Sequence, residues 1–205
     1  MSKKTVIVDY GLGNIYSVMG ALDYLGVKSD VTCEAEEIKH ADMLILPGVG
    51  SFKTAMRYLE VRGIADALKE AVLIRQTKIL GICLGLQLMA EYGDEDGGCS
   101  GLGFIQGNVT RFNAKNGLKV PHVGFNQVRF AAQSLLSSGI ENEADCYFVH
   151  SYRLEIGERL GFSSLCDYGG DFIAAYEYNN IFATQFHPEK SQTTGLKIVA
   201  NYINA

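Results

Sequence analysis

The sequence predicts a single α/β domain over residues 1–205, with a mainly parallel central sheet flanked by helices and additional antiparallel strands in the C-terminal half. Its length suits one sizeable domain, and its composition, 47% hydrophobic and 20% charged, is that of an ordinary globular protein. Up to about residue 90, short apolar runs alternate with amphipathic stretches, as in parallel β–α units. Beyond about residue 100 the runs become short, β-rich and separated by turn residues.

The N-terminal half predicts strands and helices in alternation. A helix is expected over residues 14–26, because apolar residues recur there at helical spacing, with Asn14 as its N-cap and Gly26 as its stop. A strand ending at Cys83 should lead into a helix over 84–90. The other expected strands cover residues 5–9, 28–32 and 41–47, and the other expected helices cover about 52–60 and 64–76.

The C-terminal half predicts mostly strands. They are expected within residues 102–112, 122–130, 145–154, 172–178 and 181–186. A final helix over about 190–204 should bury Leu196, Val199 and Ile203.

Composition and charge argue against several classes of protein. A net charge of −5 without a Lys/Arg cluster disfavours nonspecific nucleic-acid binding. No apolar run reaches the length of a membrane span, and the start lacks the body of a signal peptide. The cysteines, at 33, 83, 99, 146 and 166, are odd in number and form no C-x-x-C pair. This pattern favours reduced thiols in a cytoplasmic protein over a disulfide framework or a zinc site.

The stretch "ILGICLGLQLM" (residues 79–89) predicts a nucleophile on a sharp strand-to-helix turn. Gly81 and Gly85 flank Cys83 at two residues on either side, where such a strained turn leaves room only for small residues. A helix beginning after Cys83 would favour the thiolate. The alternative is an inert core cysteine, since free cysteine is among the most buried residue types.

Two further segments supply the partners that a nucleophile needs. In "ATQFHPEK" (183–190), His187 leaves a strand and Glu189 follows two residues later, which is the base and its orienting carboxylate. The competing histidines are His40, which has the pattern of a surface residue, and His122 and His150, which lie in predicted strands. The run "PGVGS" (47–51) can turn a backbone N–H toward an anion, although alone it indicates only a strand-to-helix turn.

The N-terminal "YGLGN" raises the alternative of a dinucleotide site. Gly11-x-Gly13 follows a strand and opens a helix, but the third glycine of the fingerprint would stand at position 16, which is Tyr16. We therefore expect no nicotinamide or flavin cofactor.

Taken together, these segments resemble the class I (triad) glutamine amidotransferases, in order and over nearly the whole chain. The resemblance implies a Cys83–His187–Glu189 triad that hydrolyses glutamine, with no cofactor and no metal. It implies an oxyanion hole from the backbone N–H groups of the 48–50 loop, namely Gly48, Val49 and Gly50, and of Leu84. Contacts to glutamine are implied for Gln87, Glu95, Ser151 and Tyr152.

Within that family, "DYGLGN", "GLGFIQG", "VPHVGFN" and "YFVHSY" are most similar to glutaminase subunits that deliver ammonia to a separate (β/α)8-barrel cyclase subunit in histidine biosynthesis, as a heterodimer. The resemblance implies that the Pro121–Gln127 segment faces this partner, with Phe125 and Lys190 at the interface. The family usually has Trp at position 125, and the 91–101 segment aligns uncertainly with it. The alternatives are a partner that amidates a sugar, a cysteine peptidase, and a binding subunit without catalysis.

Overall fold

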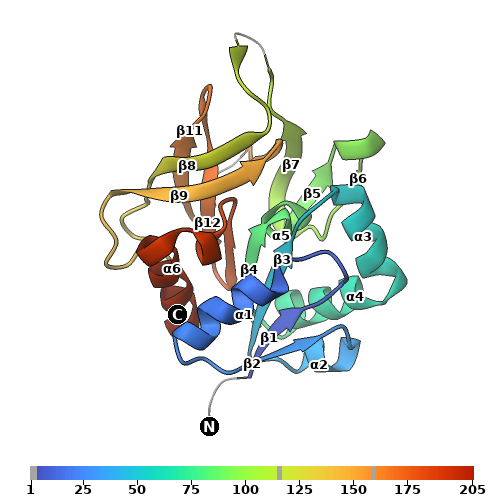
Figure 1. Ribbon diagram of the computed structural model, residues 1–205. Coiled ribbons are helices and arrows are strands. Elements are labelled where there is room, and N and C mark those ends of the chain that lie inside the picture. Colours follow the sequence, from blue (N-terminus) through green and yellow to red (C-terminus); the bar gives the residue numbers. More distant parts are fainter. Residues whose placement is uncertain (1–3, 115–116, 158–159) are drawn as a thin grey trace.

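The computed structural model describes residues 4–114, 117–157 and 160–205. A nine-stranded mixed sheet runs through the molecule in the order β2-β1-β3-β4-β13-β12-β11-β8-β9 (Figure 1). Neighbours from β2 to β13 pair in parallel, and those from β13 to β9 pair antiparallel. The predicted α/β architecture is confirmed.

The strands of this sheet have the following bounds: β1 Thr5–Val8, β2 Ser29–Thr32, β3 Met43–Gly48, β4 Lys78–Cys83, β8 His122–Arg129, β9 Glu143–His150, β11 Phe162–Asp167, β12 Asp171–Tyr178 and β13 Ile181–Thr184.

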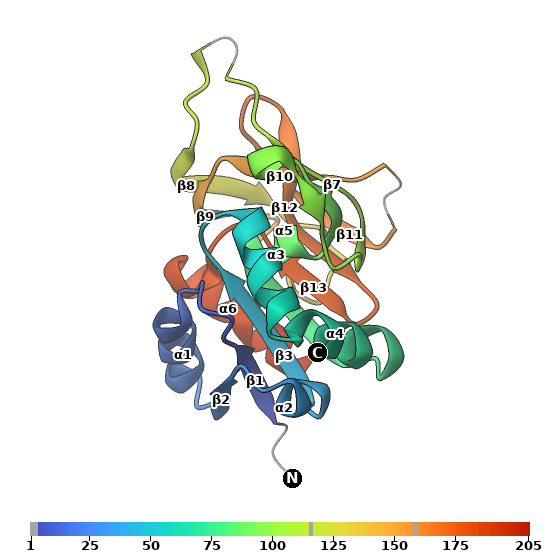
Figure 2. The same cartoon turned by 90° about the vertical axis from the view of Figure 1, so that its right-hand side faces the viewer.

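Helices cover both faces of the parallel strands, because alternate side chains of each strand point to opposite faces. Ile7 and Ile45 pack with α1 (Ile15–Tyr24) and α6 (Gln192–Asn204) on one face. Val6 and Leu46 pack with helices on the other: α2 (Ala35–Lys39), α3 (Phe52–Val61), α4 (Ile64–Lys69) and its π-helical continuation η1 (Glu70–Ile74). Figure 2 shows this helical half below the strand-rich half.

A second sheet departs from the sequence prediction. The helix after Cys83, α5 (Leu84–Leu88), is shorter than expected, and residue 90 already belongs to a strand. The chain turns extended there because Met89 O accepts hydrogen bonds from the N–H groups of Phe104 (2.8 Å) and Ile105 (2.9 Å). The order of this sheet is β10-β7-β5-β6, with β5 Ala90–Gly93, β6 Cys99–Ser100, β7 Ile105–Arg111 and β10 Tyr152–Glu155.

The C-terminal helix also packs differently from the prediction. Of the three residues expected to be buried, only Val199 is, and Leu196 and Ile203 are partly exposed. Tyr202 fills the core instead, because its hydroxyl donates to Leu44 O at 2.6 Å and to Lys78 O at 3.0 Å. The helix is thereby held against the ends of β3 and β4.

The structure also bears on disulfides, metal sites and membrane spans. All five cysteines are free thiols. Across residues 4–114, 117–157 and 160–205, no group of three His, Cys, Asp or Glu side chains could hold a metal ion. In the same part of the chain, no helix is both long and apolar enough to cross a bilayer.

Candidate active site

Cys83 sits on the sharp turn that the sequence predicts, between β4 and α5. Its φ of 55° and ψ of −106° are strained for a residue with a side chain. A Cβ at Gly85 would lie 1.8 Å from Leu46 O, and one at Gly81 would lie 2.8 Å from the Gly85 carbonyl carbon. The turn can therefore close only with glycine at both positions.

His187 and Glu189 form a buried pair beyond the end of β13. His187 Nδ1 lies 2.8 Å from Glu189 Oε1, and both side chains are 1% exposed. Burial alone would lower the pKa of His187, but its interactions with Cys83 and Glu189 outweigh burial and raise the pKa to about 10. The pKa therefore leaves the imidazole protonated at neutral pH, next to the sulfur.

The second ring nitrogen, His187 Nε2, has no hydrogen bond of standard geometry with any residue that the structure describes. Cys83 nevertheless acts on the ring, since it is among the groups that raise the pKa of His187.

A cavity of about 330 Å³ opens over Cys83 and His187. Pro121, Val149 and His150 also line it. Its remaining lining consists of residues singled out from the sequence: Val49, Gly50, Leu84, Gln87, Glu95, Ser151 and Tyr152. Gly48 is not part of the lining, since it is buried at the end of β3 and pairs in register with Cys83.

The 48–50 loop passes directly beside the candidate nucleophile. Gly50 has a φ of +102°, which only glycine adopts readily. A Cβ at Gly48 would lie 2.4 Å from the Tyr10 hydroxyl and 2.9 Å from Leu84 Cβ, so the backbone at Gly48 approaches both closely.

Gln87 lies on the cavity wall as predicted, and a residue that the sequence interpretation missed connects it to the sulfur. Gln87 Nε2 donates to Tyr152 O at 2.9 Å and to Gln185 Oε1 at 3.0 Å. Gln185 Nε2 in turn donates to Cys83 Sγ at 3.7 Å. The available signal was a polar residue in the apolar run "IFATQF", where Gln185 is completely buried.

Glu95 reaches the cavity from the η2 turn (Glu95–Gly97). Its Oε2 accepts the backbone N–H of Phe52 at 2.7 Å, at the start of α3. Burial raises the pKa of Glu95. The pKa of Tyr152 is raised chiefly by burial and, to a smaller extent, by the negative charge of Glu95. Glu95 and Tyr152 therefore lie close enough to influence each other at the cavity.

The competing histidines are already engaged elsewhere. His40 is exposed, as predicted. His150 faces the cavity, but its Nδ1 lies 2.8 Å from Tyr152 O and its Nε2 lies 3.0 Å from His122 Nδ1. Burial lowers the pKa of His122 to about 4 and that of His150 to about 3, so both rings are neutral at neutral pH.

Asn14 is the N-cap residue of α1, as predicted, but its side chain does not serve as the cap and makes no capping hydrogen bond. Its Nδ2 instead donates to Glu189 Oε1 at 3.1 Å, and its Oδ1 accepts the Ser17 hydroxyl at 2.8 Å. A polar partner 175 residues away competes with the local cap.

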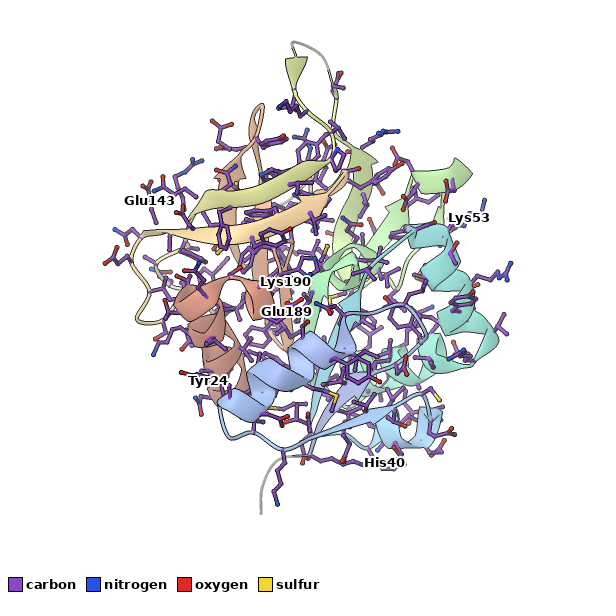
Figure 3. All side chains as sticks on the ribbon, viewed as in Figure 1. Tyr24, His40, Lys53, Glu143, Glu189 and Lys190 are labelled. Atoms are coloured by element: carbon purple, nitrogen blue, oxygen red, sulfur yellow. The ribbon has the colours of Figure 1, made fainter. Side chains whose placement is uncertain are left out.

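The residues expected to face a partner lie together on the surface. Phe125, on β8, is 51% exposed and its ring centroid lies 5.5 Å from that of Tyr147. Lys190 is exposed, and its Nζ lies 5.9 Å from the Tyr147 ring centroid (Figure 3). Phe125 and Lys190 thus flank Tyr147.

Solved structures share the fold at low sequence identity. The chain aligns with a structure described as PurLQS from Thermotoga maritima at a TM-score of 0.76 and 18% identity, covering 100% of this chain and 99% of that one. A structure described as a glutamine amidotransferase gives a TM-score of 0.73 at 18% identity, with 97% of this chain and 97% of that one covered.

Sequence relatives are much closer. The family profile described as "Glutamine amidotransferase class-I" matches residues 6–204. "Imidazole glycerol phosphate synthase subunit HisH 1" of Campylobacter jejuni (strain RM1221) is 46% identical over 197 residues, which cover 96% of this chain and 98% of that protein. Subunit HisH of Moorella thermoacetica is 44% identical over 196 residues, with 96% and 92% covered. The chain therefore belongs to the class I glutamine amidotransferases, among the HisH subunits of imidazole glycerol phosphate synthase.

Proposed function

We propose that this chain hydrolyses glutamine to glutamate and ammonia in the cytoplasm, and that it passes the ammonia to the cyclase subunit of imidazole glycerol phosphate synthase in histidine biosynthesis. The observation that carries the proposal is the meeting of Cys83, on its strained turn, with the buried His187–Glu189 pair at one cavity. The HisH relatives supply the pathway.

The triad divides the reaction between three side chains. The Cys83 thiolate attacks the side-chain amide carbon of glutamine, forming a carbon–sulfur bond and a tetrahedral oxyanion. Protonated His187 gives its proton to the departing nitrogen, and ammonia leaves. Water, deprotonated by the now neutral His187, then hydrolyses the γ-glutamyl thioester to glutamate. Glu189 holds the imidazole in orientation through the 2.8 Å contact.

The oxyanion needs backbone donors, which we assign to the 48–50 loop and to Leu84. Val49, Gly50 and Leu84 border the cavity beside Cys83. One such donor is typically worth about 3–4 kcal/mol of transition-state stabilisation. The glycines allow the loop peptides to adopt more than one orientation, so a partner could control the reaction by turning an N–H toward or away from the oxyanion.

Glutamine would bind in the cavity that this loop borders. Gln87 would contact glutamine, and Ser151, Tyr152 and Glu95 would bind its α-amino and carboxylate groups, since all four residues border the cavity. A carboxylate such as Glu95 pairs naturally with an ammonium group. The cavity volume suits a ligand the size of an amino acid.

The partner would be a separate (β/α)8-barrel cyclase subunit, in a heterodimer. Ammonia acts as a nucleophile only while unprotonated, so it must pass to its acceptor without entering bulk water. Phe125, Lys190 and the Pro121–Gln127 segment are the proposed contact surface, with Lys190 as the salt-bridge anchor. Pro121 borders the cavity as well, so this surface adjoins the site of ammonia release. The cyclase would make imidazole glycerol phosphate from the ribulosyl aminoimidazole precursor and release the aminoimidazole carboxamide ribotide by-product.

The test compares two nitrogen sources in the complex with the co-purified barrel subunit. Cys83→Ala should abolish glutamine-dependent turnover and leave ammonium-dependent turnover intact. His187→Ala should cost far more rate than Glu189→Ala, because it removes the proton transfer itself. Loss of both activities in Cys83→Ala, or retention of glutaminase activity, would contradict the proposal.

Control by the partner is tested separately. Glutamate release is measured for the isolated chain, the complex, and the complex with acceptor ligand. The proposal expects rates to rise in that order, by about 10²–10³-fold in total if one oxyanion donor is turned into place. Equal rates in all three would leave an unregulated amidohydrolase. A sugar-amidating barrel as the co-purified protein would instead support the alternative pathway.

A further inference from the structure

The carboxylate of Glu189 is deeply buried and depends on few donors. Its side chain is 1% exposed. Oε1 receives both the His187 Nδ1 contact at 2.8 Å and the Asn14 Nδ2 donor at 3.1 Å, whereas Oε2 has no hydrogen-bond partner within the described part of the chain. A buried carboxylate oxygen that loses a donor is left less well satisfied and less firmly held. Asn14 is thus one of two side-chain donors, among the described residues, that hold the Glu189 carboxylate in place.

The Asn14 amide is also held in place by a third residue. The Ser17 hydroxyl, one turn into α1, donates to Asn14 Oδ1 at 2.8 Å, which leaves the Nδ2 group to face Glu189. With the amide turned over, its oxygen would face the carboxylate oxygen at close range, so the network selects a single orientation. Figure 3 shows Glu189 beside α1, which contacts the η4 turn (Pro188–Lys190).

We propose that Asn14 is a positioning residue for the triad carboxylate, and that Ser17 acts through Asn14. The Asn14 donor keeps Glu189 Oε1 aimed at His187 Nδ1, and the carboxylate in turn keeps the imidazole oriented beside Cys83. This role explains the asparagine of "YGLGN", whose side chain makes no capping hydrogen bond in α1 and which completes no dinucleotide fingerprint. The inference rests on the proposed function for the role of the triad.

Two features separate this role from substrate binding and from helix capping. Asn14 does not line the cavity, so its loss should change kcat and not KM. Its side chain makes no capping hydrogen bond in α1, so the effect should not follow from fraying of the helix. Because Ser17 touches Asn14 and acts only by orienting it, removing both should cost no more than removing Asn14 alone.

The experiment measures alkylation of Cys83 by iodoacetamide at neutral pH in the full-length chain, with the labelled peptide identified by mass spectrometry. This reaction reports the thiolate and requires no glutamine hydrolysis, so it separates failure of this inference from failure of the proposed function. The variants are Asn14→Ala, Ser17→Ala and the double variant, with Tyr16→Ala, at a site 88% exposed on the same helix, as the matched control.

We expect Asn14→Ala to slow labelling about tenfold and Ser17→Ala about threefold, in line with the loss of a hydrogen bond to a charged group. The double variant should match Asn14→Ala, and Tyr16→Ala should match the wild type. In the complex, kcat for glutamine should fall in parallel at unchanged KM. The inference would be overturned if folded Asn14→Ala or Ser17→Ala were labelled at the wild-type rate. It would also be overturned if the double variant lost the product of the two single effects.

Discussion

Gln185 Nε2 lies 3.7 Å from Cys83 Sγ and donates a hydrogen bond to it. The same amide accepts Gln87 Nε2 through its oxygen, at 3.0 Å. Gln87 has both of its N–H bonds directed at acceptors, Gln185 Oε1 and Tyr152 O, which fixes the orientation of the Gln185 amide and aims its N–H group at the sulfur. The electrostatic environment of the sulfur is thereby coupled to the wall of the cavity.

Replacing Gln185 by methionine should lower kcat for glutamine about tenfold, because it removes a donor to the thiolate while nearly keeping the size of the side chain. Ammonium-dependent turnover by the complex should not change. Gln133→Met, at an exposed position, is the matched control and should be neutral. An unchanged kcat in Gln185→Met would show that the contact to sulfur does not assist the reaction.

The tight turn makes Gly85 irreplaceable. In Gly85→Ala the new methyl would lie 1.8 Å from Leu46 O, so β3 and α5 must separate. We expect the free energy of unfolding to fall by about 3 kcal/mol, the upper part of the usual range for overpacking. Glutamine-dependent activity should be lost with it.

Gly20→Ala is the control for this change, because Gly20 lies within α1 and an added Cβ meets nothing within 4 Å. Alanine should raise the free energy of unfolding there by about 0.5–1 kcal/mol, as expected inside a helix. Chemical denaturation of both variants gives the comparison. If the two variants had equal free energies of unfolding, the turn between β4 and α5 would tolerate a side chain at position 85.

The sequence predicts those parts of the fold that depend on local periodicity. The alternation of Val6 and Ile7 between the two faces of the sheet, and the stop of α1 at Gly26, follow directly from the pattern of side chains. The strand β5 was missed because residues 90–93 are extended through pairing with residues 99–100 and 105–109. Residues 90–93 directly follow a helical pattern, and nothing in their own sequence indicates the strands with which they pair.

The candidate site divides in the same way. The triad was predicted because its motifs are local: glycines around Cys83, and Glu189 two residues from His187. Gln185 and Asn14 were missed because their contacts cross the chain, with 102 residues between Gln185 and Cys83 and 175 between Asn14 and Glu189. Asn14 was assigned to a cap because that is the most frequent local use of asparagine before a helix.

The neutral His122–His150 pair predicts a loss of stability in acid. The pKa of His122 is lowered from 6.5 to about 4 and that of His150 from 6.5 to about 3, both chiefly by burial. At a pH between the unfolded and the folded pKa, the unfolded chain binds more protons than the folded one. The contribution of these histidines to the free energy of unfolding is therefore fully present above pH 6.5 and is lost as the pH falls toward 4. His187 has the opposite sign, since its pKa is raised to about 10 and its contribution is lost only as pH rises above 6.5 toward that value.

Urea denaturation across this acid range measures the effect. His122→Gln should flatten the dependence of the free energy of unfolding on pH, whatever its effect on stability at neutral pH. His40→Gln, at an exposed histidine, is the control and should retain the wild-type slope. If the free energy of unfolding of His122→Gln depended on pH as steeply as that of the wild type, other groups would be the cause of the acid sensitivity.

The most direct test of the central claim is labelling of the complex by the diazoketone analogue of glutamine, which alkylates the nucleophile that attacks it. The peptide that carries the label is identified by mass spectrometry. The account predicts that the label is on Cys83, that excess glutamine protects against it, and that His187→Ala greatly slows its formation because the imidazolium that favours the thiolate is gone. Loss of glutaminase activity with the label on any other residue, or with Cys83 unmodified, would contradict it.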